Sequence, residues 1–155
     1  MAIDVAIEST IERTHDDVFA AVADLDAWPT WLIASGIRSV RRERAGEPSQ
    51  GERLVVEQNA AGRAGIFDAQ VTGFEAGRHI ALRGRDRDGV SIEMEAVVAP
   101  TPGTDGGSSE LQFSIRIGLP LKYRVFESMA RPQVERAALL DVESLRLRLE
   151  SPAEG

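Results

Sequence analysis

Apolar and polar residues alternate along the first segment of the chain, where one side of the alternation consists of Ile3, Val5, Ile7, Ser9 and Ile11. A period of two predicts a half-buried β-strand over residues 3–11. Thr14 is a favourable helix N-cap, and the acidic pair that follows it suits the positive end of a helix dipole. Apolar residues then recur at helical spacing, which predicts a helix over residues 15–25.

Both tryptophans of the chain lie in one short motif, with the sequence Asp26-Ala-Trp28-Pro29-Thr-Trp31. Proline is tolerated in the first turn of a helix, where its missing N–H would have no partner. We therefore expect a short second helix around Pro29, with both indole rings turned inward. Two interpretations are open. The tryptophans anchor the short helices in the core, or at least one of them lines the mouth of a hydrophobic cavity.

From residue 36 onward the pattern changes to short alternating segments separated by turns that contain glycine. The dipeptide Asp88-Gly89 is a strong signal for a β-hairpin. The predicted strands are residues 37–44, 52–59, 66–75, 78–86, 90–99 and 110–119.

The C-terminal segment is helical in its spacing, with one apolar stripe formed by Val134, Ala138, Val142, Leu145 and Leu149. The stripe predicts a helix over residues 132–149 with Pro132 in its first turn, preceded by a shorter helical or kinked segment over residues 121–130. Leu140 and Leu147 lie well off the stripe. We expect both to be at least partly buried, because a curled sheet would touch the helix on more than one side.

This order of elements predicts the α+β class. A seven-stranded antiparallel sheet would curl around the long C-terminal helix, which is the only long element able to cover its apolar face, and two short helices would follow the first strand. The chain has 155 residues and shows no repeat or second domain boundary. We therefore expect a single domain over residues 1–155.

Composition excludes several classes of function. The formal net charge of −7 argues against a dedicated nucleic-acid surface, and the lack of cysteine removes disulfides and thiolate chemistry. His15 and His79 are placed on the surface by the pattern and form no recognisable metal site, so we expect neither a metal nor a cofactor. The N-terminus lacks a signal-peptide pattern and no apolar run approaches the roughly 20 residues of a transmembrane helix. A cytoplasmic protein without stable membrane insertion is expected.

The chain resembles the SRPBCC or START-like helix-grip superfamily, in particular its branch of polyketide cyclase/dehydrase-like proteins. The resemblance covers nearly the whole chain, and its most specific element is the motif that contains the two tryptophans. It also includes the segments HDDVFAAVADLDAWPTW, GERLVVEQ, VTGFEAGRHIALRG and ALLDVESLRLRLE, together with the opening strand. The resemblance implies a helix-grip fold with an elongated cavity between the sheet and the long helix. It also implies binding of lipids, sterols, polyketides or other apolar molecules, and in some members cyclisation or dehydration.

We expect the cavity to be lined by inward-facing residues of the strands and of the C-terminal helix. The candidate ligand-binding residues are Trp28, Trp31, Leu54, Val56, Gln58, Phe67, Leu82, Met94, Phe113, Ile115, Tyr123, Phe126, Met129, Val134, Ala138 and Asp141. Gln58 and Tyr123 could offer polar contacts to a ligand. Asp141 is either a buried acid or base or, as we favour, a flank carboxylate paired with Arg148 or with solvent.

No acid–base pair with convincing spacing is present, so no catalytic residue is assigned and enzyme activity stays open. The favoured interpretation is a protein that binds a small hydrophobic molecule, as a monomer or a homodimer. The first alternative is an enzyme of the polyketide cyclase type that acts on a ligand in the same cavity, where positioning alone can assist catalysis. The second alternative is an interaction module whose cavity is vestigial and whose Leu140 and Leu147 mediate dimerisation.

Overall fold

The computed structural model describes residues 2–60 and 62–151, and it contains every strand that the alternation predicts. Most strand ends agree with the prediction within two residues. The strand predicted to start at residue 66 starts three residues earlier, because pairing with its hairpin partner continues to the closing pair Ala60 and Arg63. The strands are β1 (Ala2–Ile11), β2 (Ile37–Arg42), β3 (Arg53–Ala60), β4 (Arg63–Glu75), β5 (His79–Arg85), β6 (Ser91–Pro100) and β7 (Ser109–Gly118).

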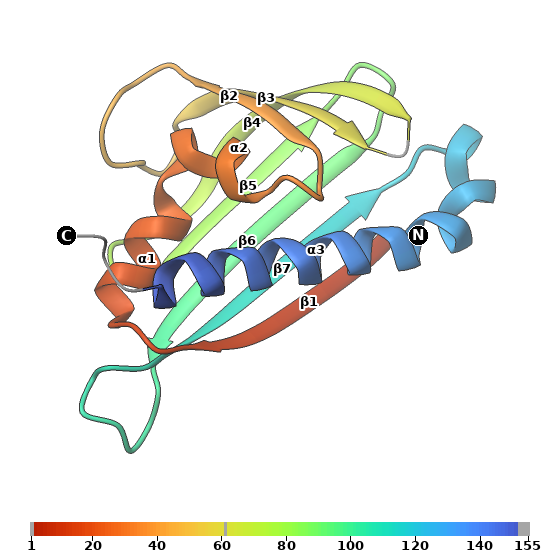
Figure 1. Ribbon diagram of the computed structural model, residues 1–155. Coiled ribbons are helices and arrows are strands. Elements are labelled where there is room, and N and C mark those ends of the chain that lie inside the picture. The colour runs from red at the N-terminus through yellow and green to blue at the C-terminus, as the bar shows by residue number, and fades with distance from the viewer. Residues whose placement is uncertain (1, 61, 152–155) are drawn as a thin grey trace.

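The strands form one antiparallel sheet with the order β1-β7-β6-β5-β4-β3-β2. All neighbours except β1 and β7 are consecutive in the chain, so the sheet is a meander whose last strand closes against its first. The sheet is curled, and β2 and β3 bend toward the side on which the long helix lies (Figure 1). This is the predicted helix-grip architecture.

The two short helices follow β1 as expected. Helix α1 (His15–Ala23) is capped by Thr14, whose hydroxyl accepts a hydrogen bond from the N–H of Asp17 at 3.2 Å. A short 3₁₀ turn, η1 (Leu25–Ala27), leads into α2 (Trp28–Trp31), which has its proline in the first turn. The sequence FAAVADLDAWPTW therefore makes a compact helical corner over one end of the sheet.

The long helix, α3 (Glu127–Glu150), begins five residues earlier than predicted and follows a 3₁₀ segment, η2 (Leu121–Phe126). The placement of Pro132 in the first turn is therefore wrong, because this proline lies inside the helix. Its missing N–H leaves the carbonyl of Ser128 without the usual intrahelical donor. Both residues are exposed, so water can satisfy that carbonyl.

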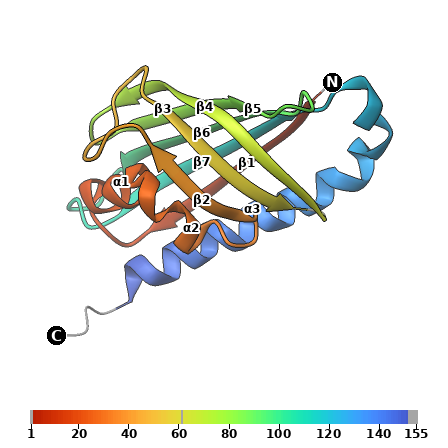
Figure 2. The ribbon, with the colours of Figure 1, turned by 90° about the horizontal axis from the view of Figure 1, so that it is seen from above.

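Helix α3 crosses the concave side of the sheet and contacts β1 and α2 (Figure 2). Only the face bearing Ala138, Val142 and Leu145 is buried. The expected burial of Leu140 and Leu147 is wrong, because their side chains are 57% and 54% exposed. The sheet curls over the helix from one side alone, and the outer face of α3 is left to solvent.

Replacing Leu145 with Ala is expected to lower the free energy of unfolding by about 2–3 kcal/mol, because the residue is 1% exposed and truncating it leaves a cavity in the core. We place the effect in the lower part of the usual range because a helix on the open side of a sheet can relax toward the gap. Urea denaturation measures the change. The matched control is Leu147→Ala on the solvent face, expected within about 0.5 kcal/mol of wild type. Equal losses in the two variants would contradict this packing.

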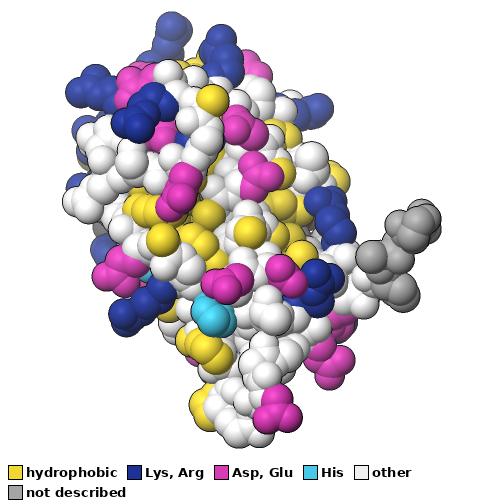
Figure 3. Space-filling model, turned by 90° about the vertical axis from the view of Figure 1, so that its left-hand side faces the viewer, with side chains coloured by type: hydrophobic (Ala, Val, Ile, Leu, Met, Phe, Trp, Pro, Cys, Tyr) yellow, Lys and Arg dark blue, Asp and Glu magenta, His cyan; other side chains and the backbone are white. Residues whose placement is uncertain are grey.

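The surface carries charges of both signs. Seen from the end of the molecule with α1 and the C-terminal end of α3, Lys and Arg side chains lie around the rim with Asp and Glu between them (Figure 3). The described residues on this face thus present no continuous basic track of the kind that nucleic acids require. Among the described helices, none is long and apolar enough to cross a membrane.

Candidate functional site

A cavity of 590 Å³ lies between the sheet, the N-terminal half of α3 and the loop that follows α2. The ends of β3, β4, β6 and β7 form its floor, and the segment η2 closes one side. Ile33 and Phe126 line it while being 68% and 53% exposed, so the cavity opens to solvent between the loop and η2. Its apolar walls include Phe67, Val90, Ile92, Met94, Ile115, Ile117, Leu119 and Val134.

Polar side chains occupy only part of this wall. Among the described residues that line the cavity, Arg63 is the one with a charge. The uncharged polar groups are Ser35, Gln58, Asn59, Tyr123 and Gln133. A mainly apolar pocket with a few polar groups is typical of sites for small organic ligands.

The rim of the cavity is held by Asp141, which is 2% exposed and projects from α3. Its two carboxylate oxygens accept hydrogen bonds from the backbone N–H groups of Ala34 and Ser35, each at 2.8 Å. The favoured pairing of Asp141 with Arg148 is therefore wrong: Arg148 instead donates to the backbone carbonyl of Thr30 at 2.8 Å. A buried carboxylate needs such donors, and here they fix the loop after α2 to the long helix.

A charged cluster lies at the mouth beside the start of β4. The guanidinium of Arg63 donates to the carboxylates of Asp86, which is buried, and of Asp88 at 2.8 Å. Its charge also lies 5.5 Å from the ring centroid of Tyr123. Partial burial acts to lower the pKa of Arg63, but the hydrogen bonds to Asp86 and Asp88 outweigh it and hold the pKa above its ordinary value. Arg63 therefore stays charged and paired.

The structure brings many of the predicted ligand-binding residues together. Those that line the main cavity are Gln58, Phe67, Met94, Ile115, Tyr123, Phe126 and Val134. A second, much smaller pocket of about 20 Å³ shares lining residues with the main cavity, among them Gln58, Phe67 and Met94. Its walls include three further candidates, Trp28, Val56 and Leu82.

The other candidates lie elsewhere. Leu54, Phe113 and Ala138 are buried in the core, Met129 is 66% exposed, and neither they nor Trp31 and Asp141 line the cavity. Trp31 packs edge-on against Phe113 with ring centroids 5.7 Å apart, and the indole N–H of Trp28 donates to the carbonyl of Val22 at 2.9 Å. Both rings anchor the helical corner, and the exposed rim is formed by the loop after them.

Sequence reasoning missed that loop, residues 33–37, and it missed Arg63, Val90, Ile92 and the polar residues Ser35, Asn59 and Gln133. The loop carries no periodicity, and its only signal is Gly36, whose φ of +80° and close approach to the carbonyl of Asn59 favour glycine. Arg63 falls in a glycine-containing turn by its pattern, although it begins a strand.

A buried ion pair was also missed. The side chain of Arg42 is 4% exposed and donates two hydrogen bonds to the carboxylate of Glu52, at 2.6 and 2.9 Å. It also contacts Asp26 at 3.2 Å. Arg42 is therefore buried although it lies in a segment rich in arginine, a pattern typical of a solvated strand face. The acidic residue of the tryptophan motif thus ties the helical corner to β2.

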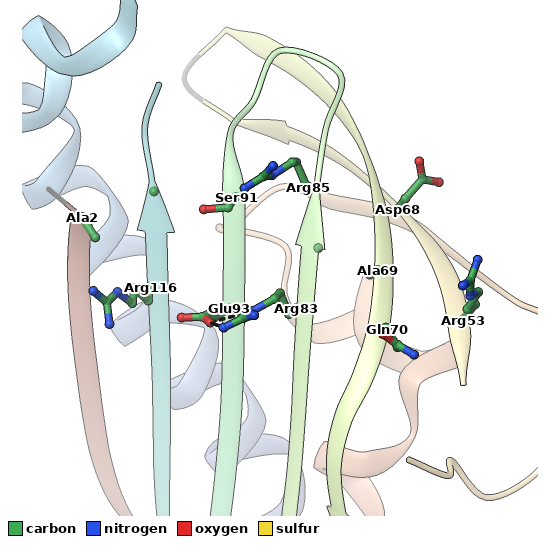
Figure 4. Close-up of a pocket in the computed structure, with 12 residues that line it drawn as sticks. Ala2, Arg53, Asp68, Ala69, Gln70, Arg83, Arg85, Ser91, Glu93 and Arg116 are labelled. Carbon is green, nitrogen blue, oxygen red and sulfur yellow. Dashed lines mark hydrogen bonds and ion pairs between the residues drawn. The ribbon is translucent and has the colours of Figure 1, made fainter. Parts of the chain in front are cut away.

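A second hollow, of 630 Å³, lies on the opposite face of the sheet (Figure 4). It is a shallow, charged surface on which Arg83 donates to Glu93 across the strands at 2.8 Å, and Arg116 contacts Asp4 at 3.5 Å. Solvated cross-strand pairs of this kind are ordinary features of an exposed sheet face. The cavity under α3 is therefore the candidate site.

A family model described as "Polyketide cyclase / dehydrase and lipid transport" matches residues 2–150 of the chain. No curated protein matches the sequence.

Solved structures with the same fold cover almost the whole chain. A START superfamily protein from Mycobacterium smegmatis aligns with a TM-score of 0.70 and 17% identity, over 95% of this chain and 97% of its own. The Zhui aromatase/cyclase from Streptomyces sp. R1128 aligns with a TM-score of 0.75 and 15% identity, over 97% of this chain and 94% of its own. Truncated norcoclaurine synthase from Thalictrum flavum aligns with a TM-score of 0.68 and 12% identity, over 98% of this chain and 96% of its own. At these identities the likeness shows the fold alone.

Proposed function

Because the chain belongs to the polyketide cyclase / dehydrase and lipid transport family, we propose that it binds a small apolar or amphipathic molecule in the cavity under α3. The observation that carries the proposal is the volume of 590 Å³ with mainly apolar walls between the sheet and α3. Protein interiors fill their space by default, so a cavity of this size with apolar walls favours a ligand over a vestigial pocket.

The chemistry of the walls favours binding over proton-transfer catalysis. Among the described lining residues, the chain places no carboxylate or histidine, and Arg63 carries the one charge. Arg63 keeps its proton in the pair with Asp86, so it cannot act as a base. A cyclase acting in this cavity would depend on positioning of its substrate, and binding is the step common to both functions.

The test is titration with the neutral fluorescent probe N-phenyl-1-naphthylamine (NPN). Apolar burial contributes about 25 cal/mol per Å², enough for a bicyclic aromatic to bind measurably in a preformed pocket. We expect about one equivalent of NPN to bind, with enhanced emission. Ala137→Phe, which places a ring in the cavity from α3, should weaken binding at least tenfold.

Glu135→Phe adds the same ring on the exposed face of α3 and serves as the matched control, because it should leave NPN binding unchanged. Circular dichroism verifies the fold of both variants. If wild-type protein binds no NPN at high micromolar concentration, or if Ala137→Phe binds it as well as wild type, the proposed site is wrong.

A further inference from the structure

Gln58 holds its side-chain amide in a fixed orientation in the wall of the cavity. It lines both the main cavity and the small pocket that shares its wall. Its Nε2 donates to the backbone carbonyl of Ser35 at 2.8 Å, and the N–H of Ser35 is in turn held by Asp141. A carbonyl oxygen can only accept a hydrogen bond, so the amide must turn its NH₂ group toward Ser35. The other end of the amide, Oε1, is then a positioned acceptor.

The acceptor Oε1 of Gln58 has no donor from the protein in the described part of the chain. The hydrogen bond of this side chain is the one from Nε2 to the carbonyl of Ser35. Oε1 is not among the fully buried polar atoms without a partner. It is therefore reachable by solvent. A ligand that covers it removes its water, and the loss is offset only if the ligand donates a hydrogen bond in return.

Charge along the cavity wall is already compensated. Arg63, which lines the cavity, lies between the carboxylates of Asp86 and Asp88, and the ammonium group of Lys122 lies 3.8 Å from the carboxylate of Asp88. Two positive and two negative groups thus meet at the mouth. An anionic ligand would lose its hydration on entry without gaining an unpaired positive charge.

We propose that the ligand is a neutral, mainly apolar molecule with a hydroxyl or N–H group that donates a hydrogen bond to Oε1 of Gln58. The inference rests on the proposed binding function and makes Gln58 the residue that selects among apolar ligands. A ligand with only acceptor groups would leave two acceptors facing each other, and a carboxylate would in addition lose its hydration without gaining an unpaired positive charge.

Displacement of NPN by three naphthalenes of matched shape tests the proposal. 2-Naphthol has the donor, 2-methoxynaphthalene keeps the oxygen without the donor, and 2-naphthoate carries a negative charge. We expect 2-naphthol to bind about tenfold more tightly than either of the others, the factor that corresponds to one lost hydrogen bond. Gln58→Leu should abolish the preference over 2-methoxynaphthalene. Gln112→Leu, which removes an exposed amide from the outward face of β7, is the matched control and should retain it.

A separate variant tests the effect of charge at the mouth of the cavity. Asp88→Asn removes one carboxylate from Arg63 and should raise the affinity for 2-naphthoate several-fold. Asp105→Asn changes the net charge equally in a remote exposed loop and should not. Unchanged binding of 2-naphthoate in Asp88→Asn would overturn the neutral-ligand part of the proposal.

The outcomes separate this inference from the binding function. If NPN itself does not bind, the cavity function fails. If NPN binds and the three naphthalenes displace it equally, or 2-naphthoate binds best, the cavity function stands and the ligand class is wrong. Should Gln58→Leu not fold, the side-chain amide resonances of Gln58 in the wild-type protein decide: they should shift with 2-naphthol and not with 2-methoxynaphthalene, and equal shifts overturn the role of Gln58.

Discussion

Glu52→Ala is expected to lower the free energy of unfolding by about 3–5 kcal/mol, because it leaves the buried guanidinium of Arg42 without its main partner. The remaining contact, to Asp26, involves a carboxylate that is 62% exposed and cannot replace a two-bond pair. Urea denaturation at neutral pH measures the loss. The control is Glu47→Ala in the preceding exposed loop, expected within about 0.5 kcal/mol of wild type.

The same pair predicts a pH dependence. The two hydrogen bonds from Arg42 lower the pKa of Glu52 below its ordinary value and outweigh the opposing effect of burial. A carboxyl group with a lowered pKa in the folded state stabilises the fold above its unfolded pKa of about 4.3, and the stabilisation is lost as the pH falls through the folded value. The stability difference between wild type and Glu52→Gln should therefore shrink in acid. A difference that stays constant down to pH ~2 would contradict the pairing.

A double variant separates the interaction from the cost of an orphaned charge. Arg42→Met combined with Glu52→Leu removes both charges at similar volume, and it should be less destabilised than Glu52→Ala alone. Additive losses in the double variant would mean that the two side chains do not depend on each other.

The strands were predictable because alternation is a local signal. Each strand of the sheet has one face against the core and one toward solvent. The apolar positions therefore predict both the strand and its buried side, as in Ile3, Val5 and Ile7 of β1 or Leu111, Phe113 and Ile115 of β7. The long helix was expected over the sheet because it is the only long element able to cover the apolar face, and the family resemblance implied the same helix-grip fold. Together these give the fold within a few residues at each strand end.

The ion pair and the cavity rim were not predictable because they depend on contacts between residues that are far apart in the sequence. Arg42 and Glu52 are ten residues apart and meet only through the hairpin between β2 and β3. Asp141 meets Ser35 across 106 residues. Leu140 is exposed because of how far the sheet curls, a property of the whole assembly that no local pattern contains.

The cavity was partly predictable. The alternation along each strand predicted that Gln58, Phe67 and Met94 face inward, and these residues line the cavity. It predicted the same for Leu54, which is packed in the core. Alternation reports which side chains face inward but not where the interior is left unfilled. The unfilled volume lies toward η2, and its rim is a loop without periodicity.

Asp141→Ala is expected to have the largest combined effect on stability and binding. It removes two charge-assisted hydrogen bonds from the N–H groups of Ala34 and Ser35, and it leaves the buried N–H of Ser35 unsatisfied. We expect the free energy of unfolding to fall by about 3–5 kcal/mol. The loop is then released from α3, and the carbonyl that orients Gln58 moves with it. We expect NPN affinity to fall at least tenfold, in addition to the loss of stability, because an unfixed rim must be ordered on binding.

Asp141→Asn keeps one oxygen acceptor and should lie between wild type and Asp141→Ala in both measurements, because its NH₂ group faces one of the two backbone N–H groups. Glu135→Ala removes an exposed carboxylate from the same helix and should leave stability and binding near wild type. The binding measurement is made well below the unfolding temperature of each variant, so that a fall in affinity reports on the folded protein. If Asp141→Ala loses stability but binds NPN as tightly as wild type, Asp141 contributes to folding and not to binding. The cavity would then be shaped by the sheet and α3 without a contribution from the loop.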